Sequence, residues 1–273
     1  MDVGQTNKFV KEGTVLNSFH YQGLLVLVVV MINQIDIEGR SKVDIAIERL
    51  KTFEPQGEPY YVAISGGKDS DVIVKLCELA GVKYELHHQH TTADAPQTVR
   101  YIRETYPSCI IDYPEIPIWK LIEKQGVPPT RLMRYCCKVL KEYGGEGRTK
   151  VLGVRWSEST GRKNNRKMVE LCYKNYTKTI NPIIDWTEQE VWEFHQLYNL
   201  PHNPLYDMGY KRVGCIGCPQ KGKKRMLEDF KRFPKYKENY IRAFERMLKV
   251  RKEKGLETTW KTGEEVFDWW INL

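Results

Sequence analysis

One hexapeptide, SGGKDS at residues 65–70, constrains the fold of this 273-residue chain more than any other feature. It follows a short apolar run at 60–64, which predicts a buried strand, and it opens a segment at 69–80 that predicts a helix. In such a turn the glycines let backbone N–H groups approach an anion, and the helix N-terminus favours negative charge. The lysine adds a point charge, and the serines add hydroxyl donors. We therefore predict a phosphate site formed by Ser65, Gly66, Gly67, Lys68, Asp69 and Ser70.

Strand and helix patterns alternate after this loop, and a helix at 41–53 with Ser41 as its N-cap precedes it. Such alternation favours an α/β fold, in which a parallel twisted sheet has helices on both faces (a Rossmann-like α/β/α sandwich). Ligands of these sheets bind beyond the carboxyl ends of the strands, where we expect the hexapeptide together with Thr91, Thr92 and Asp94. The strand candidates are 60–64, 83–88, 108–113 and 150–154, and the helix candidates are 69–80, 95–106, 117–125 and 134–143.

Four later segments have their own patterns. Residues 161–179 are polar and basic, which suggests a mobile loop over the ligand-binding edge. Thr187 and Glu190 have the spacing of a capping box and predict a helix start. A long amphipathic stretch at 221–254 and a short helix at 263–271 predict a helical C-terminal region.

An apolar run at 23–32 resembles a targeting segment, but a bilayer span needs about 20 apolar residues. No small-residue cleavage site follows it, so we expect neither a signal peptide nor a membrane partner. The run is either a buried strand or, as we favour, part of a non-native extension upstream of a start at Met31. We then expect a cytoplasmic protein with reduced cysteines. The predicted regions are an N-terminal extension at 1–34, a nucleotide-binding domain with a cysteine cluster at 35–220, and a basic helical region at 221–273.

The chain is basic, with a formal net charge of +8 and a sequence pI near 9.0. This charge favours acidic partners such as nucleotides and nucleic acid, and it does not choose between them. Many of the lysines and arginines lie at 211–254. That stretch is either a solvated helix face or a surface that binds nucleic acid. Assembly into a homo-oligomer also stays open.

Four of the seven cysteines form two pairs, Cys136-Cys137 and Cys215-x-x-Cys218. A Cys-x-x-Cys bounded by glycine and proline can direct both sulfurs at one centre. Adjacent cysteines diverge, which suits the separate irons of a [4Fe–4S] cluster better than one zinc ion. We therefore predict an iron–sulfur cluster, with zinc or reduced thiols as the alternatives. Of the other three, Cys77 and Cys109 have the apolar context of core residues, and Cys172 in the basic loop stays unassigned.

The hexapeptide resembles the pyrophosphate loop of the ATP-pyrophosphatase (adenine nucleotide alpha-hydrolase) superfamily, whose members split ATP between its α and β phosphates. Over residues 58–220 the chain resembles the phosphoadenylylsulfate (PAPS) and adenylylsulfate reductase family within that superfamily. Iron–sulfur members carry Cys-Cys and, much later, Cys-x-x-Cys; here 77 residues separate Cys137 from Cys215. The resemblance implies that these four cysteines bind the cluster and that Lys141 lies beside it.

The resemblance also implies roles for two arginines. Residues 153–159 are similar to the family's G-x-R-x-x-x-S loop, which holds nucleotide phosphate or sulfate. We accordingly expect Arg155 and Arg162 to stabilise charge at the reacting group, Lys68 to hold pyrophosphate, and Asp69 to help place Mg²⁺.

Two departures from the family favour the use of ATP. The reductases attack sulfur with a cysteine in a C-terminal segment, and residues 219–273 contain no cysteine. The reductases also usually have a degenerate phosphate loop, whereas this one is intact. We expect an enzyme that binds ATP or an adenylyl nucleotide such as adenylyl sulfate and performs adenylation-linked sulfur chemistry. The alternatives are a true reductase that uses Cys172 or a thioredoxin-like partner, and a subunit that modifies nucleic acid with sulfur.

Overall fold

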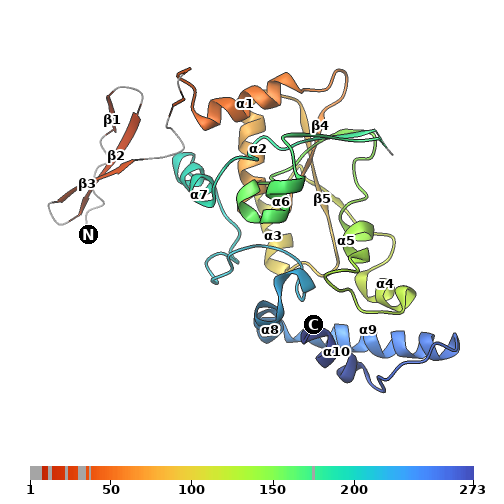
Figure 1. The fold of residues 1–273 in the computed structure, drawn as a ribbon. Helices are drawn as coiled ribbons and strands as arrows, with labels where there is room; N and C mark the ends of the chain where they lie inside the picture. Colours follow the sequence, from red (N-terminus) through yellow and green to blue (C-terminus); the bar gives the residue numbers. More distant parts are fainter. Residues whose placement is uncertain (1–7, 12–13, 22–23, 30–34, 37, 174–175) are drawn as a thin grey trace. The chain divides into compact units, whose positions relative to one another are not determined.

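The computed structural model describes residues 8–11, 14–21, 24–29, 35–36, 38–173 and 176–273 (Figure 1). The chain divides into two compact units. The first comprises the chain up to Leu86 together with Gly145–His202, and the second comprises His87–Gly144 together with Asn203–Leu273.

A six-stranded sheet has the order β6-β5-β4-β7-β9-β8. The pairs β4–β7, β5–β6 and β7–β9 are parallel, and the edge strand β8 is antiparallel to β9. This mostly parallel sheet with its helices confirms the predicted α/β fold. The strands are β4 (Tyr60–Ala63), β5 (Tyr84–Gln89), β6 (Ile110–Asp112), β7 (Thr149–Val151), β8 (Val169–Cys172) and β9 (Thr177–Ile180).

The helices of the first unit begin where their sequences place caps. Ser41 and Asp44 form a capping box at the start of α1, and Thr187 and Glu190 form the predicted one at α7. Helix α2 contacts both α1 and α7, and Trp186 and Phe194 are fully buried in this unit. The helices are α1 (Lys42–Thr52), α2 (Lys68–Ala80), α6 (Thr160–Asn165) and α7 (Glu188–Leu197), with a 3₁₀ turn η2 (Trp156–Glu158).

The second unit has an aromatic core formed largely by its C-terminal helices. Trp270 and Tyr240 pack with ring centroids 4.7 Å apart, and both contact Phe230 and Phe244. The indole N–H of Trp270 donates to the carbonyl of Pro129 at 2.6 Å. The helices are α3 (Pro96–Thr105), α4 (Ile118–Gln125), α5 (Tyr135–Leu140), α8 (Lys223–Arg232), α9 (Pro234–Glu253) and α10 (Gly263–Ile271), with a 3₁₀ turn η3 (Pro219–Lys221).

The prediction of a loop at 161–179 was wrong, because this segment contains most of α6 and both strands of the β8–β9 hairpin. Its edge strand is half-buried to exposed, so it lacks the apolar pattern that marks a strand. The amphipathic stretch at 221–254 is two helices that meet at Pro234. Phe233 has φ −126° and ψ 66°, outside the helical region, because a following proline disfavours the α conformation.

Three antiparallel strands precede α1 in the chain and form a separate sheet: β1 (Lys8–Lys11), β2 (Thr14–Tyr21) and β3 (Leu24–Val29). The backbone of β3 agrees with the strand interpretation of the apolar run. The proposed start at Met31 lies outside the described residues. Of the helices that the structure describes, none combines the length and the apolar character needed to cross a bilayer.

Candidate functional site

The predicted phosphate loop joins β4 to α2 in the first unit, as the sequence indicated. Gly66 has φ +68°, a left-handed conformation that favours glycine. Gly67 is the N-cap of α2, and its carbonyl accepts a 2.6 Å hydrogen bond from the Ser70 hydroxyl. The Gly67 N–H donates to the same hydroxyl at 3.2 Å. These bonds hold the first turn of α2 in place.

Lys68 is buried at the start of α2, with 4% of its surface exposed. Its ammonium lies 3.7 Å from Asp69 Oδ2 and 3.6 Å from Glu188 Oε1, beyond ordinary hydrogen-bond distance. It also lies 5.9 Å from the centre of the Trp192 ring. A cation held in this way beside a helix N-terminus suits a phosphate oxygen.

Arg155 is 3% exposed and also lies in the first unit. Its Nε donates to Asp69 Oδ1 at 2.6 Å, and its Nη1 donates to Ser157 Oγ at 2.7 Å. The chain before it approaches α2 closely at Gly153, where a Cβ would lie 2.9 Å from the Asp69 carbonyl oxygen. The arginine loop and the phosphate loop are therefore brought together, and Asp69 is already an ion-pair partner.

Arg162 lies in the first turn of α6, which follows the η2 turn after Arg155. Ser159 caps this helix by accepting a hydrogen bond from the Arg162 N–H. The guanidinium pairs with Glu158, and the Arg162 side chain is 29% exposed. Both predicted arginines thus have a carboxylate partner within the first unit.

His195 is a residue that the sequence reasoning missed. Its Nε2 lies 2.9 Å from the Lys68 carbonyl oxygen, and the residue is 4% exposed. Burial lowers the pKa of this imidazole, which favours the neutral ring with Nε2–H donating to the carbonyl. It lies three residues after Trp192, on the same face of α7, and this spacing was the available signal.

The four paired cysteines all lie in the second unit, and their charges act on one another. The pKa of Cys136 is raised by its hydrogen bond to Cys137 and by burial, and the charges of Cys215 and Cys218 add to this rise. The pKa of Cys137 is lowered, first by the bond from Cys136 and then by a hydrogen bond from Arg134. The structure therefore gathers both cysteine pairs in one region.

Lys141 lies among these sulfurs. The charge of Cys215 raises the pKa of the Lys141 ammonium, against the opposing effect of burial, and Asp94 and Cys218 add to the rise. The Cys215 thiol itself donates to Thr91 Oγ1 at 3.4 Å. A buried cation beside several thiols offsets the negative charge that metal-binding thiolates carry.

The Cys215-x-x-Cys218 turn is fixed by Gly217, which has φ +69°. Its N–H donates to the fully buried carboxylate of Asp229 at 2.9 Å, and Lys221 pairs with that carboxylate at 2.7 Å. A Cβ on Gly217 would lie 2.5 Å from the Phe230 ring, so glycine is required here on two grounds.

Within the described part of the chain, no three His, Cys, Asp or Glu side chains form a site for a metal ion. The iron–sulfur and zinc interpretations therefore stay predictions. Cys77 is a core residue as predicted, and burial raises the pKa of its thiol to about 12. Cys109 is only half-buried, and Cys172 is exposed on β8.

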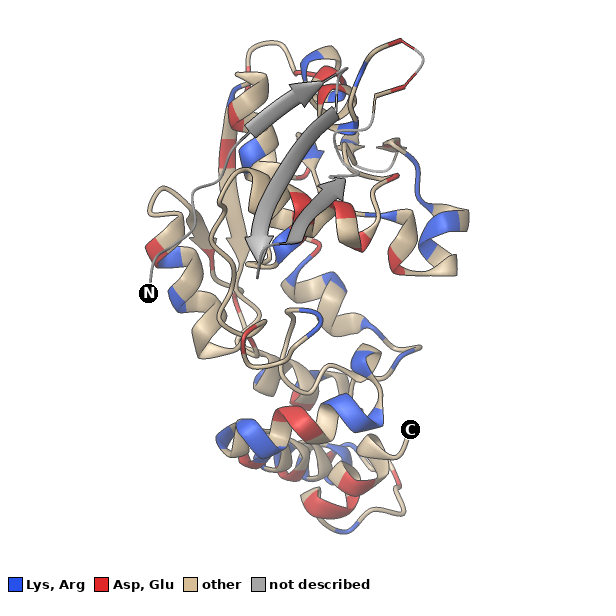
Figure 2. Ribbon diagram, turned by 90° about the vertical axis from the view of Figure 1, so that its left-hand side faces the viewer, with Lys and Arg blue, Asp and Glu red and all other residues tan. Residues whose placement is uncertain are grey.

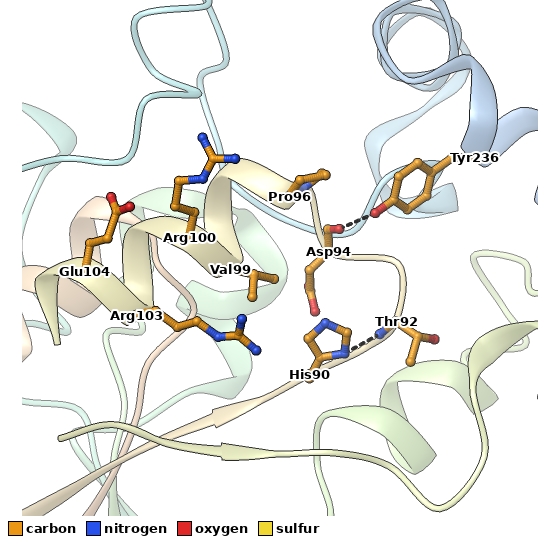
Figure 3. A pocket seen from close by; sticks show the side chains of 9 residues that line it. All are labelled: His90, Thr92, Asp94, Pro96, Val99, Arg100, Arg103, Glu104 and Tyr236. Carbon is orange, nitrogen blue, oxygen red and sulfur yellow. Dashed lines mark hydrogen bonds between the residues drawn. The ribbon is translucent and has the colours of Figure 1, made fainter. Parts of the chain in front are cut away.

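The second unit also contains a pocket of about 460 Å³ beside α3 (Figure 3). His90 Nδ1 accepts a hydrogen bond from the Thr92 N–H at 3.1 Å, and the Tyr236 hydroxyl donates to the Asp94 carbonyl at 2.7 Å. The wall contains two arginines and two carboxylates, so its formal charge does not favour a ligand of either sign. The lining residues are His90, Thr92, Asp94, Pro96, Val99, Arg100, Arg103, Glu104 and Tyr236.

The curated proteins that this chain resembles include uncharacterized proteins and adenosine 5'-phosphosulfate reductases. An uncharacterized protein of Methanocaldococcus jannaschii is 27% identical over 202 residues, which are 69% of this chain and 42% of that protein. An adenosine 5'-phosphosulfate reductase of Bacillus cereus is 28% identical over 177 residues, which are 60% of this chain and 74% of that enzyme. The chain spans less than half the length of the first two curated relatives, at 42% and 48%.

Among solved structures, a phosphoadenylyl-sulfate reductase from Candida auris in a phosphate complex has a TM-score of 0.48 at 21% identity. The match covers 62% of this chain and 87% of that one. The family model of the phosphoadenosine phosphosulfate reductase domain matches residues 59–221. Because this segment is more than half of the chain, the chain belongs to the phosphoadenosine phosphosulfate reductase domain family.

Proposed function

We propose that this protein binds ATP at the loop 65–70 and adenylates an acceptor as one step of sulfur chemistry. The observation that carries the proposal is the position of Lys68, buried at the first turn of α2 behind the left-handed Gly66. A β-phosphate and a γ-phosphate need such a cradle of backbone N–H groups and a fixed cation.

In the proposed reaction an acceptor oxygen attacks the α-phosphorus of ATP. The bond between this phosphorus and the bridging oxygen breaks, and pyrophosphate leaves with the electron pair. Lys68 and the loop amides stabilise the charge that develops on pyrophosphate, and Arg155 stabilises the reacting phosphoryl group together with Arg162. Asp69 Oδ1 already accepts from Arg155, so we assign Mg²⁺ to Asp69 Oδ2, which lies 3.7 Å from the Lys68 ammonium.

We also propose that Cys136, Cys137, Cys215 and Cys218 bind a [4Fe–4S] cluster. Four thiols gathered in one unit, with Lys141 and Arg134 to offset their charge, fit this group. A cube spreads its ligands over four irons, whereas a single zinc ion needs them to converge on one point, which makes zinc the weaker alternative. When bound, the cluster supplies electron transfer or tunes the local field, and the protein holds it with these side chains.

The test is pyrophosphate release from ATP and Mg²⁺ by the purified protein. Lys68→Ala should lower the rate by about 100-fold or more, the usual effect of removing one charge-stabilising donor. Lys75→Ala is the matched control, because Lys75 lies on the same helix and forms a partly exposed ion pair with Glu78. Equal rates for the two variants would reject the role of the loop.

A true reductase is the second candidate, favoured by the similarity to the Bacillus cereus enzyme. In that case the protein releases sulfite from adenylylsulfate or its 3′-phosphorylated form when a thioredoxin-like reductant is supplied. It then needs a nucleophilic thiol, and the exposed Cys172 is the candidate on this chain. Sulfite release that disappears in Cys172→Ser, without pyrophosphate release, would favour this candidate. The third candidate is a nucleic-acid-modification subunit that binds its partner through the basic 211–254 region.

A further inference from the structure

Both segments that carry the paired cysteines lack acidic residues. Residues 124–141 contain five lysines and arginines with no Asp or Glu, and residues 208–227 contain six with none. The lysines and arginines can be followed in blue in Figure 2. Arg134 pairs with Glu142 and Lys221 with Asp229, and the remaining lysines and arginines of the two stretches give the unit an excess of positive charge that attracts polyanions.

The two segments contact each other directly. Arg131 Nε donates to the Pro219 carbonyl at 3.2 Å, and Gln220 Nε2 donates to the Arg131 carbonyl at 3.2 Å. Arg131 Nη2 lies 2.9 Å from the position that a Cβ on Gly222 would take. We call residues 130–134 and 219–225 together the basic rim.

An apolar side chain stands at the tip of this rim. Leu132 is 95% exposed, and its neighbour Met133 is 46% exposed. Their turn is held by two hydrogen bonds, from the Thr130 N–H to the Met133 carbonyl at 3.2 Å and from the Met133 N–H to Thr130 Oγ1 at 3.0 Å. Arg131 and Arg134 flank the pair in the sequence. An exposed leucine between two arginines suits a partner that offers apolar surface beside negative charge.

We propose that the basic rim binds nucleic acid, with the arginines and lysines on phosphates and Leu132 against the stacked bases. Phosphate contacts by Lys and Arg supply most of the affinity of such complexes, and proteins that deform a duplex insert apolar side chains between base steps. An acidic protein would match the charge, but a duplex offers phosphates and, where a base step opens, apolar base faces beside them. Nucleic acid binding at the basic rim does not require ATP turnover.

The charge part of the proposal is tested by fluorescence anisotropy of a labelled 20-base-pair DNA duplex over a range of NaCl concentrations. Lys224 and Arg225 are exposed on α8, and in Lys224→Gln/Arg225→Gln the slope of log K against log[salt] should fall by about 1.8, from about 0.9 per lost phosphate contact. Lys252→Gln/Lys254→Gln at the end of α9 is the matched control and should keep the slope. No salt-dependent binding, or equal slopes for the two double variants, would overturn the proposal.

The apolar part is tested by comparing the duplex with inorganic polyphosphate, which has the charge but no bases. Leu132→Ala should weaken duplex binding about tenfold and leave polyphosphate binding unchanged, since only the duplex offers apolar surface to bury. Leu256→Ala removes a leucine that is 49% exposed elsewhere in the same unit, and it should change neither affinity. Unchanged duplex affinity in Leu132→Ala would overturn the base contact. A protein that binds the duplex but releases no pyrophosphate would reject the proposed reaction and leave this inference standing.

Discussion

Arg155 donates through Nε to Asp69 Oδ1 at 2.6 Å across a separation of 86 residues in sequence. This pair ties the segment after β7 to the first turn of α2 in the first unit. Because Asp69 is the residue after Lys68, the pair also sets the direction in which the phosphate loop presents its backbone.

Asp69→Asn should therefore destabilise the protein. The change leaves the guanidinium of Arg155, which is 3% exposed, without its carboxylate, and breaking a buried pair from one side costs about 3 kcal/mol or more. Urea unfolding gives the free energy of unfolding directly. Glu78→Gln breaks the more exposed pair with Lys75 and should cost less than about 1 kcal/mol. Similar losses in both variants would contradict the structural role of Asp69.

Gly153→Ala should disturb the phosphate loop. The added Cβ would lie 2.9 Å from the Asp69 carbonyl oxygen. Because the Gly153 chain meets the backbone of Asp69 here, and not a flexible side chain, there is little room to adjust. We expect a loss of stability of about 1–3 kcal/mol and weaker ATP binding by calorimetry. Gly161→Ala is the control, because its Cβ would meet only Ser159 Oγ at 4.0 Å. Retention of both stability and ATP affinity in Gly153→Ala would show that the close approach is absent in solution.

His195 should make the stability of the protein depend on pH. Its pKa in the folded state lies below the usual 6.5 because of burial, so the unfolded chain binds a proton at a higher pH than the folded chain does. Its contribution to stability is fully present above about pH 6.5 and is lost as the pH falls through the folded pKa. The free energy of unfolding of the wild type, relative to that of His195→Gln, should therefore decrease as the pH falls from 7.5 to 5.5. A difference that stays constant over this range would exclude a buried neutral imidazole.

Anaerobic purification should yield a brown protein with about four irons per chain if the cysteines bind a [4Fe–4S] cluster. Cys218→Ser should lose the iron and the visible absorbance, because each cysteine thiolate holds one of the four irons of the cluster. Cys172→Ser should keep both, since this exposed thiol lies in the other unit from the four paired cysteines. A colourless protein with one zinc ion per chain would reject the cluster.

The sequence predicted the elements whose signals are local. The capping boxes at Ser41 and Thr187 satisfy helix N–H groups within one turn, so their residue types and spacing suffice. The loop 65–70 is likewise a short continuous pattern between a strand and a helix. The β8–β9 hairpin was missed because an edge strand with one half-exposed face needs few apolar residues.

The partners of the site residues could not be predicted in the same way. The Asp69–Arg155 pair and the contact of His195 with the Lys68 carbonyl join segments separated by 86 and 127 residues. Such pairings are set by how the sheet and helices pack, and a single sequence does not record them.

The contact of Gly217 with the rings of Phe230 and Tyr240 has a consequence for the thiols on either side of it. The bend that carries the half-buried Cys215 and Cys218 packs on its inner side against the aromatic core. Oxidation or loss of these two thiols would therefore change the packing of the last three helices, and the redox state of the two cysteines would be coupled to the folding of the C-terminal region.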